Sequence, residues 1–300
     1  FVKGVIDSSD LPLNVSREIL QQNRIMAKIK SNSVKKILDK IKTISKNKDK
    51  YKDFYTEFGR LLKEGVYQDF EHKEAITELL RFKSTKEEGY VSLQDYVDRM
   101  NSDQKSIYYI TGTNETALRE SPLLEMYREK DLEVLILDDE IDEIIIPSIP
   151  TYKEKDLKSV NRSGAADELK DDSNDDKEKE LKPLIKKIKT TLGEKVKDVK
   201  ASNRLSDSPC CIVADENDPT AQMQEIMRAA GQVGMPEIKP ILEINPNHKI
   251  VKKLAGMRKG KSFDDTVLLL YEQSLLQEGV KLDNPADFVK RLNKVMQKAL

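Results

Sequence analysis

The side chains that most often do chemistry are scarce in this sequence of 300 residues. His72 and His248 are its two histidines, and both lie among charged or polar residues, which favours surface or helix-capping roles over catalysis. Cys210 and Cys211 are adjacent, so a disulfide between them would be strained, and two ligands cannot complete a zinc site. We therefore expect buried, reduced thiols, which fit a reducing compartment and a cytoplasmic location.

The motifs of self-contained enzymes are also missing from the sequence. It contains no Gly-x-x-x-x-Gly-Lys-Ser/Thr phosphate loop, no Gly-x-Ser-x-Gly turn and no His-Glu-x-x-His pair. The acidic run at 171–176 lacks the Gly and the Glu that calcium loops place at fixed offsets. We expect this chain to bind no metal and no cofactor by itself.

The overall charge and hydropathy argue against two classes of partner. Lys and Arg number 52 against 53 Asp and Glu, a net charge of -1, whereas nucleic-acid binders usually carry a basic surplus. No apolar run approaches the roughly 18 residues of a membrane-spanning helix, and the first residues do not resemble a signal peptide. We expect neither nucleic acid nor a membrane as partner.

Apolar spacing predicts a helix-rich first part, residues 1–85. A helical pattern begins near Ser16, a suitable capping residue, and one face of it carries Ile37, Leu38, Ile41 and Ile44. The i, i+3, i+4, i+7 spacing is repeated further on by Tyr51, Phe54, Tyr55 and Phe58. Lysines fill the other faces, so these helices should each bury one side.

Residues 86–156 indicate a small α/β unit. Two buried strands are expected at 106–112 and 133–137, with a helix at 114–130 in which Pro122 marks a start or a break. Strand, helix and strand within about thirty residues are typical of a βαβ unit with a parallel pair. The apolar run from Glu143 to Pro147 could begin a third strand.

The composition changes abruptly at residues 153–182, which are rich in Lys, Asp and Glu and contain no aromatic residue. Such a segment can bury little, so we expect a solvated, charged linker, assigned to residues 157–182. Residues 183–300 then predict an α+β domain. Its strands are expected at 196–201, 210–214 and 240–244, after a helix at 184–192 that ends at Gly193. Two helices close the chain, at 263–276 and from Pro285 onward.

Four sequence blocks resemble one known family. They are FVKGVIDSSDLPLNVSRE at 1–18, IYYITG at 107–112, NRLSDSPCCIV at 203–213 and LEINPNH at 242–248. In this order they are similar to the middle and C-terminal domains of the ninety-kilodalton heat-shock chaperones. The blocks span nearly the whole chain, so the resemblance implies a multi-domain chaperone fragment.

The resemblance implies an ATPase that is completed outside this chain. The family's ATP-binding domain, with its ATP and Mg²⁺, would precede Phe1, and Arg17 would contact the γ-phosphate, where a planar, always charged guanidinium stabilises the transferring group. Gln21 lies one turn later and could support the site, and Asn14 is a weaker candidate. The alternative is that these are ordinary surface side chains. The chain alone should not hydrolyse ATP.

The resemblance also implies a homodimer held by a bundle of the last two helices from each chain. Independently, the helix at 263–276 is apolar around much of its circumference, and an isologous bundle would bury it. The last helix carries an apolar stripe. The residues proposed for dimerisation are Leu268, Tyr271, Phe288, Leu292, Val295 and Met296. Packing within one chain is the alternative.

A methionine-rich segment at 221–231 is the third implied site. In the family such a helix faces the cleft between protomers, so Met223, Ile226 and Met227 could contact unfolded or partly folded client proteins. A plain core stripe remains open. Co-chaperones are possible further partners.

The chain lacks an initiator Met and the tail motifs of eukaryotic members, so a bacterial member with an internal or cleaved start is expected. A non-enzymatic dimeric scaffold is the competing function.

Overall fold

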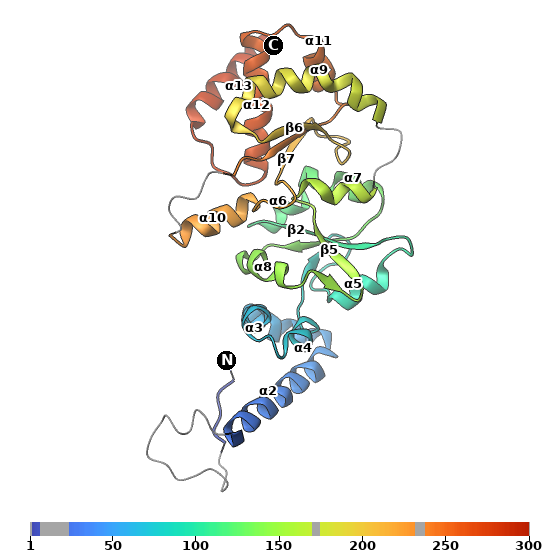
Figure 1. Ribbon diagram of the computed structural model, residues 1–300, viewed down its shortest axis with the longest axis vertical. Helices are drawn as coiled ribbons and strands as arrows, with labels where there is room; N and C mark the ends of the chain where they lie inside the picture. The colour runs from blue at the N-terminus through green and yellow to red at the C-terminus, as the bar shows by residue number, and fades with distance from the viewer. Residues whose placement is uncertain (1, 7–23, 170–174, 232–237, 300) are drawn as a thin grey trace.

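The computed structural model describes residues 2–6, 24–169, 175–231 and 238–299. These residues form three tiers along the long axis of the molecule (Figure 1). Helices make one end, a five-stranded sheet with its helices lies in the middle, and a three-stranded sheet with its helices makes the other end.

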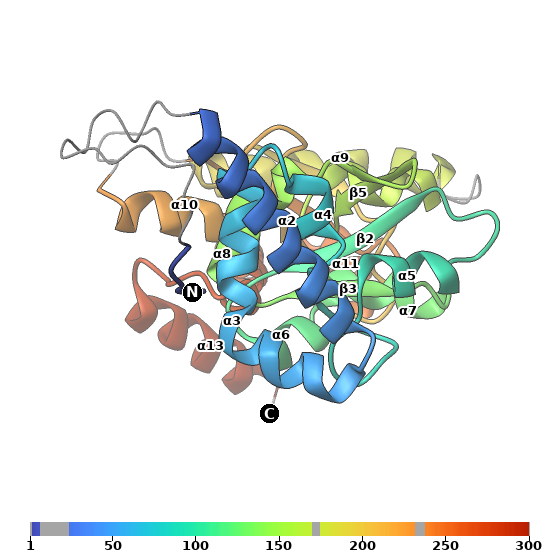
Figure 2. The same ribbon diagram turned by 90° about the horizontal axis from the view of Figure 1, so that it is seen from below.

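The helical tier consists of α2 (Arg24–Ser45), α3 (Lys48–Gln68) and α4 (Lys73–Thr77). α3 begins after Asn47, whose side chain accepts a hydrogen bond of 3.0 Å from the backbone N–H of Lys50. Figure 2 shows α2 and α3 side by side. The apolar faces predicted from spacing are the ones turned inward, with Ile41, Tyr51, Tyr55, Leu62 and Val66 buried. The helical prediction is confirmed from residue 24 onward, and Ser16 lies outside the described residues.

The middle tier is a mixed sheet with the strand order β1-β3-β2-β5-β4. The strands are β1 (Lys83–Ser84), β2 (Ser106–Thr111), β3 (Val134–Leu137), β4 (Thr151–Tyr152) and β5 (Lys155–Ser159). β2 and β3 are parallel, as predicted, with Tyr109 opposite Leu135. Their crossover contains α6 (Glu115–Arg119), a 3-10 turn (Pro122–Leu124) and α7 (Glu125–Glu129), so Pro122 marks a break. α5 (Leu93–Arg99) precedes β2, and α8 (Glu140–Ile145) follows β3.

The last tier has the strand order β6-β8-β7, from β6 (Asp198–Ala201), β7 (Cys210–Val213) and β8 (Ile241–Ile244). All three strands lie within predicted ranges. Its helices are α9 (Asp175–Leu192), α10 (Ala221–Ala229), α11 (Lys249–Gly256), α12 (Lys261–Gln277) and α13 (Pro285–Ala299). Gly193 follows α9 with φ of +54°, a left-handed conformation that suits glycine and ends the helix as predicted.

Arg204 joins the middle and last tiers. Its side chain is fully buried, and its guanidinium donates to the carbonyls of Val160 at 2.5 Å and Arg162 at 2.9 Å. It also pairs with Glu243, at 3.0 Å from Nε to Oε2. Removing one partner from such a buried pair leaves an uncompensated charge in the interior, which is strongly destabilising. The two tiers are therefore connected by a satisfied, buried charge.

The third strand predicted at Glu143–Pro147 is wrong. Residues Glu140–Ile145 form α8, and Ile146–Ser148 form a 3-10 turn. The side chain of Asp139 accepts a hydrogen bond from the N–H of Ile141 and so caps the helix. A short apolar run fits a buried strand and a buried helix equally well, and here the preceding cap decides.

The solvated linker predicted for the charged segment is also wrong for much of its length. β5 pairs in parallel with β2, and the following residues Ser163–Leu169 form a 3-10 helix in which Ala165 and Ala166 are buried. α9 then begins at Asp175, earlier than the helix predicted at 184. β5 is held by backbone hydrogen bonds, which any side chain permits, so a polar composition does not exclude a strand.

Candidate functional site

α10 projects from the side of the molecule, at the level where the two sheets meet (Figure 1). The Thr220 side chain caps it by accepting a hydrogen bond of 3.1 Å from the N–H of Met223. Met223, Ile226 and Met227 share one face, as the sequence indicates, and each is only partly buried. No residue of α10 is fully buried. The alternative of a plain core stripe is therefore not what the structure shows for this helix.

α8 lies against α10 and carries a further apolar side chain at the surface. The two helices are in contact, and the Thr220 hydroxyl donates a hydrogen bond of 2.7 Å to Oε1 of Glu143 on α8. Ile144, also on α8, remains 39% exposed. The sequence analysis missed Ile144 because it took this segment for a strand. Even a helical interpretation would have placed Ile144 on the same face as the buried Ile141, three residues before it, so the exposure of Ile144 is set by the surrounding structure.

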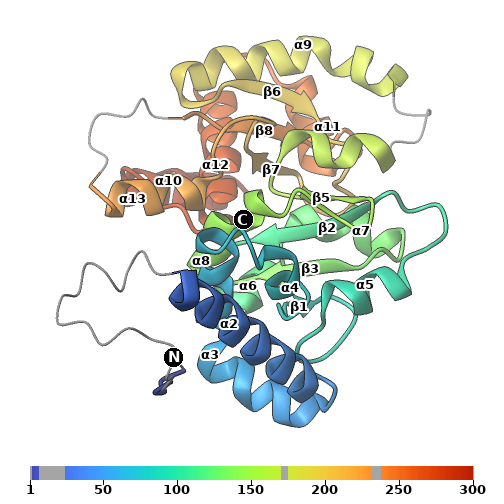
Figure 3. The same ribbon diagram turned by 60° about the horizontal axis from the view of Figure 1, so that its bottom comes forward.

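α13 lies on the same side of the molecule as α10 (Figure 3). It is attached to α12 by its charged face, through an Arg291–Glu272 ion pair and a Lys294–Asp265 pair of 2.5 Å. None of its described side chains is fully buried, and Met296 is 51% exposed. The apolar stripe formed by Phe288, Leu292, Val295 and Met296 is therefore incompletely covered by this chain.

α12 agrees only in part with the expectation that its apolar residues take part in dimerisation. Tyr271 is only 7% exposed, belongs to the core of the last tier, and donates a hydrogen bond of 3.0 Å to the carbonyl of Lys195. Leu268 is partly buried against the same core. Tyr271 is thus engaged within its own chain and does not extend the open stripe of α13.

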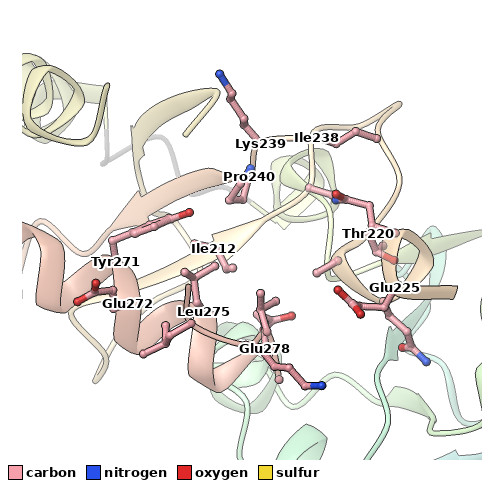
Figure 4. A pocket seen from close by; sticks show the side chains of 18 of the residues that line it. Ile212, Thr220, Glu225, Ile238, Lys239, Pro240, Tyr271, Glu272, Leu275 and Glu278 are labelled. Atoms are coloured by element: carbon pink, nitrogen blue, oxygen red, sulfur yellow. The ribbon is translucent and has the colours of Figure 1, made fainter. Parts of the chain in front are cut away.

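A cavity of about 650 Å³ lies between α10, α12, α13 and the ends of the sheet strands. Figure 4 shows Glu225 of α10 across from Glu272, Leu275 and Glu278, with Ile212 on β7 and Pro240 just before β8. α10 contributes Gln222, Glu225 and Arg228, which belong to its polar face. α10 therefore turns a polar face toward this cavity, and Met223, Ile226 and Met227 are not among the lining residues.

A hydrogen-bond network forms the wall of the cavity at the ends of β2 and β5. Thr111 donates from Oγ1 to Oε1 of Glu143 at 2.5 Å, and its N–H donates to Oδ1 of Asn161 at 2.9 Å. The amide of Asn161 in turn donates to Oε2 of Glu278 at 3.4 Å. Burial raises the pKa of Glu278 to about 7, against the smaller opposing effects of Asn161 and Arg204.

Known proteins resemble this chain over its whole length. The sequence profile described as Hsp90 protein matches residues 1–300. The chain belongs to the Hsp90 family. It is 54% identical over 305 residues to the chaperone protein HtpG of Treponema denticola, covering 99% of this chain and 48% of that protein. It is 51% identical over 308 residues to HtpG of Aliarcobacter butzleri, covering 100% and 48%. For HtpG of Borreliella burgdorferi the values are 48% identity over 299 residues, 99% and 48%.

The chain spans about half the length of these HtpG relatives. The residues that the Hsp90 resemblance assigned to ATP chemistry, Asn14, Arg17 and Gln21, lie outside the described residues, so their roles remain predictions. The helices assigned to client contact and dimerisation are described: Met223, Ile226 and Met227 of α10 are partly buried, and Met296 of α13 is exposed.

The cysteines and His248 behave as predicted. Cys210 and Cys211 are free and buried on β7, and burial raises the pKa of Cys210 to about 11. Such thiols are poor nucleophiles at neutral pH. His248 caps α11, because its Nδ1 accepts a hydrogen bond of 3.2 Å from the N–H of Ile250. The partly buried ring of His72 lies 3.0 Å from the carboxylate of Asp69.

Within the described ranges, no three His, Cys, Asp or Glu side chains are grouped so that they could hold a metal ion. None of the described helices combines the length and the apolar character that crossing a membrane requires.

Proposed function

We propose that this chain is the client-binding and dimerising part of an HtpG-type chaperone. The observation that carries the proposal is the apolar surface of α8 and α10, formed by Ile144, Met223, Ile226 and Met227. The names of its relatives describe chaperones, and a chaperone needs a surface that accepts many apolar sequences. We call this set of four residues the α8–α10 surface.

Methionine suits such a surface because its unbranched thioether chain adapts to irregular partners at little cost. Apolar residues clustered at the surface, rimmed by polar side chains, mark interaction sites. α10 contacts the rest of the chain mainly at α8, so its apolar face can meet a client without unfolding the core.

Substituting the α8–α10 surface tests this proposal. Met223→Ser should weaken binding of a permanently unfolded protein, such as reduced and carboxymethylated lactalbumin, by about tenfold or more, since burying a methionine is worth about 1.5 kcal/mol or more. Fluorescence anisotropy with the labelled probe gives the affinity. Glu129→Ser, at an exposed position on α7 outside the cavity, is the control and should not weaken binding. Equal affinities for the parent and Met223→Ser would contradict the proposal.

We also propose that α13 dimerises the chain. Its charged face is engaged with α12, whereas its apolar stripe is incompletely covered, and a second copy of the same stripe would cover it in a two-fold bundle. The two reduced, buried thiols fit a reducing compartment, which supports a cytoplasmic location.

The ATP-related part of the proposal concerns Arg17. In a protein that joins this chain to an ATP-binding domain with Mg²⁺, Arg17→Ala should reduce ATP turnover by about 10³-fold or more, because an arginine of this type stabilises the transferring phosphoryl group. Nucleotide affinity should change little, and Arg17→Lys should restore little of the rate. Gln21→Ala and Asn14→Ala should have smaller effects. If turnover stays within about twofold of the parent, the chain contributes no catalytic arginine. A dimeric scaffold would then describe it better.

A further inference from the structure

The cavity beneath α10 contains two carboxylates that lack a cationic partner. Glu143 accepts hydrogen bonds from the hydroxyls of Thr111 at 2.5 Å and Thr220 at 2.7 Å. Glu278 accepts one bond of 3.4 Å from the amide of Asn161. Across the ranges that the structure describes, no lysine or arginine makes an ion pair with either carboxylate.

Most cations of the cavity lining are already engaged elsewhere. The paired ones are Arg228 with Glu225, Lys239 with Glu194, and Arg291 with Glu272. Lys195 and Lys281 are exposed to solvent. Arg204 acts on Glu278 through its field, but its guanidinium is bound by Glu243 and by backbone carbonyls. A carboxylate withdrawn from water without a counter-charge is costly, so a cation entering the cavity would be stabilised there.

Gln222 provides a second, independent indication of a ligand. It lines the cavity from α10, and both its Nε2 and its Oε1 are buried without a hydrogen-bond partner among the described residues. A primary amide carries a donor and an acceptor side by side, which is the complement of a peptide group. Leaving both unpaired costs free energy that a bound peptide group would recover.

The remaining lining suits an aliphatic chain. Ile212, Leu268 and Leu275 contribute apolar surface from β7 and α12. The volume of about 650 Å³ is within the range of ligand-binding clefts and exceeds what one long side chain requires. Apolar walls with a carboxylate at one end match a side chain that has an aliphatic stem and a charged tip.

We propose that this cavity binds a lysine or arginine side chain of an unfolded client. The cationic group lies at Glu143 and Glu278, the stem lies against Leu268 and Leu275, and Gln222 pairs with the adjoining peptide group. This inference rests on the proposed client-binding function. It adds a preference: clients in which basic residues alternate with apolar ones bind best, because the α8–α10 surface and the cavity are the two faces of one helix.

Two labelled, unstructured peptides of identical length test the cavity. One carries three lysines among apolar residues, and in the other each lysine is replaced by methionine. The parent chain should bind the lysine peptide more tightly. Glu278→Gln and Glu143→Gln, which keep the shape of the side chains, should each weaken binding of the lysine peptide by about tenfold or more, as expected for a charge-assisted hydrogen bond. The affinity of these variants for the methionine peptide should stay within about twofold of that of the parent.

Controls separate the cavity from the fold and from client binding as such. Glu129→Gln makes the same change at an exposed position on α7 and should alter neither affinity. Gln222→Leu should weaken the binding of both peptides, because both contain peptide groups that Gln222 would pair with. If the parent binds the peptides equally, or if both Gln variants retain the preference for lysine, the cavity assignment is wrong and the α8–α10 surface stands. If the parent binds neither peptide, the proposed client-binding function fails, and the cavity assignment fails with it.

Discussion

Helices α3 and α13 carry similar apolar stripes, and the molecule uses them differently. α3 buries Tyr51, Tyr55 and Leu62 against the rest of its tier. α13 fully buries none of its described side chains and turns Arg291 and Lys294 toward α12. The periodicity of the sequence is equally clear in both helices. It shows that each helix has a partner surface, but not whether that surface belongs to the same chain.

Charged side chains make contacts in both helices. α3 leaves Lys50 and Lys52 in solvent, and its buried Lys63 pairs with Asp142 of α8 at 2.8 Å, beside a stripe that is itself buried. α13 uses Arg291 and Lys294 to fix its position on α12, and its stripe is only partly covered, with Met296 exposed. Charged contacts thus accompany a buried stripe in one helix and a partly covered stripe in the other.

Among the substitutions that test this comparison, one at Leu62 in α3 should have the largest effect, and the effect is on the free energy of unfolding. Leu62→Glu places a charge in the core without a partner, and the free energy of unfolding should fall by about 4 kcal/mol or more. Urea denaturation followed by circular dichroism measures the loss. Leu61→Glu is the matched control, since Leu61 is an exposed neighbour on the same helix. A stable, folded Leu62→Glu chain would mean that the stripe of α3 is dispensable.

The same change in α13 should separate the chains instead of unfolding them. Leu292→Glu introduces a charge into the proposed seam twice, once from each copy, at a cost of several kcal/mol in association. In analytical ultracentrifugation at micromolar concentration, the parent should run near twice 34.3 kDa and the variant near 34.3 kDa. Lys290→Glu, at an exposed position away from the stripe, should remain dimeric. A monomeric parent, or a variant that unfolds as it dissociates, would assign the stripe to an intrachain role.

The smallest expected effect concerns the ion pair between α12 and α13. Arg291→Ala removes the partly buried pair with Glu272 and should lower the free energy of unfolding by about 1 kcal/mol. Hydrogen exchange should quicken along residues 285–297, which then report the looser attachment of α13. Lys290→Ala, which loses only an exposed contact of 3.6 Å to Asp287, should have no measurable effect. Unchanged exchange in Arg291→Ala would show that α13 is held by its apolar residues alone.

Strong local signals made much of the fold predictable. The β2–β3 pair was found because continuous apolar runs flank a helical segment, and Pro122 was recognised as a break because it cannot continue a helix. β5 was missed because it alternates Lys, Asp and Leu and is stabilised by pairing with β2, a strand about fifty residues earlier in the chain. Such non-local pairing leaves little trace in the local composition.

The candidate site was only partly predictable for a related reason. Met223, Ile226 and Met227 were assigned to client contact through the family resemblance, and their spacing indicates only that they share one face of a helix. Ile144 and Glu278 could not be assigned, because their importance comes from lying beside α10 and Asn161, far away in sequence. The pairing of Arg204 with Glu243 likewise joins positions that are unremarkable in isolation.

Arg204 has a mechanical consequence for the whole chain. Its guanidinium holds carbonyls of the middle tier and a carboxylate of the last tier in one buried cluster, so any rotation between the tiers must stretch several short bonds at once. The junction therefore resists rotation of the middle tier against the last tier. In a dimer joined at α13, the middle and last tiers of each chain would then be expected to turn together about a common axis.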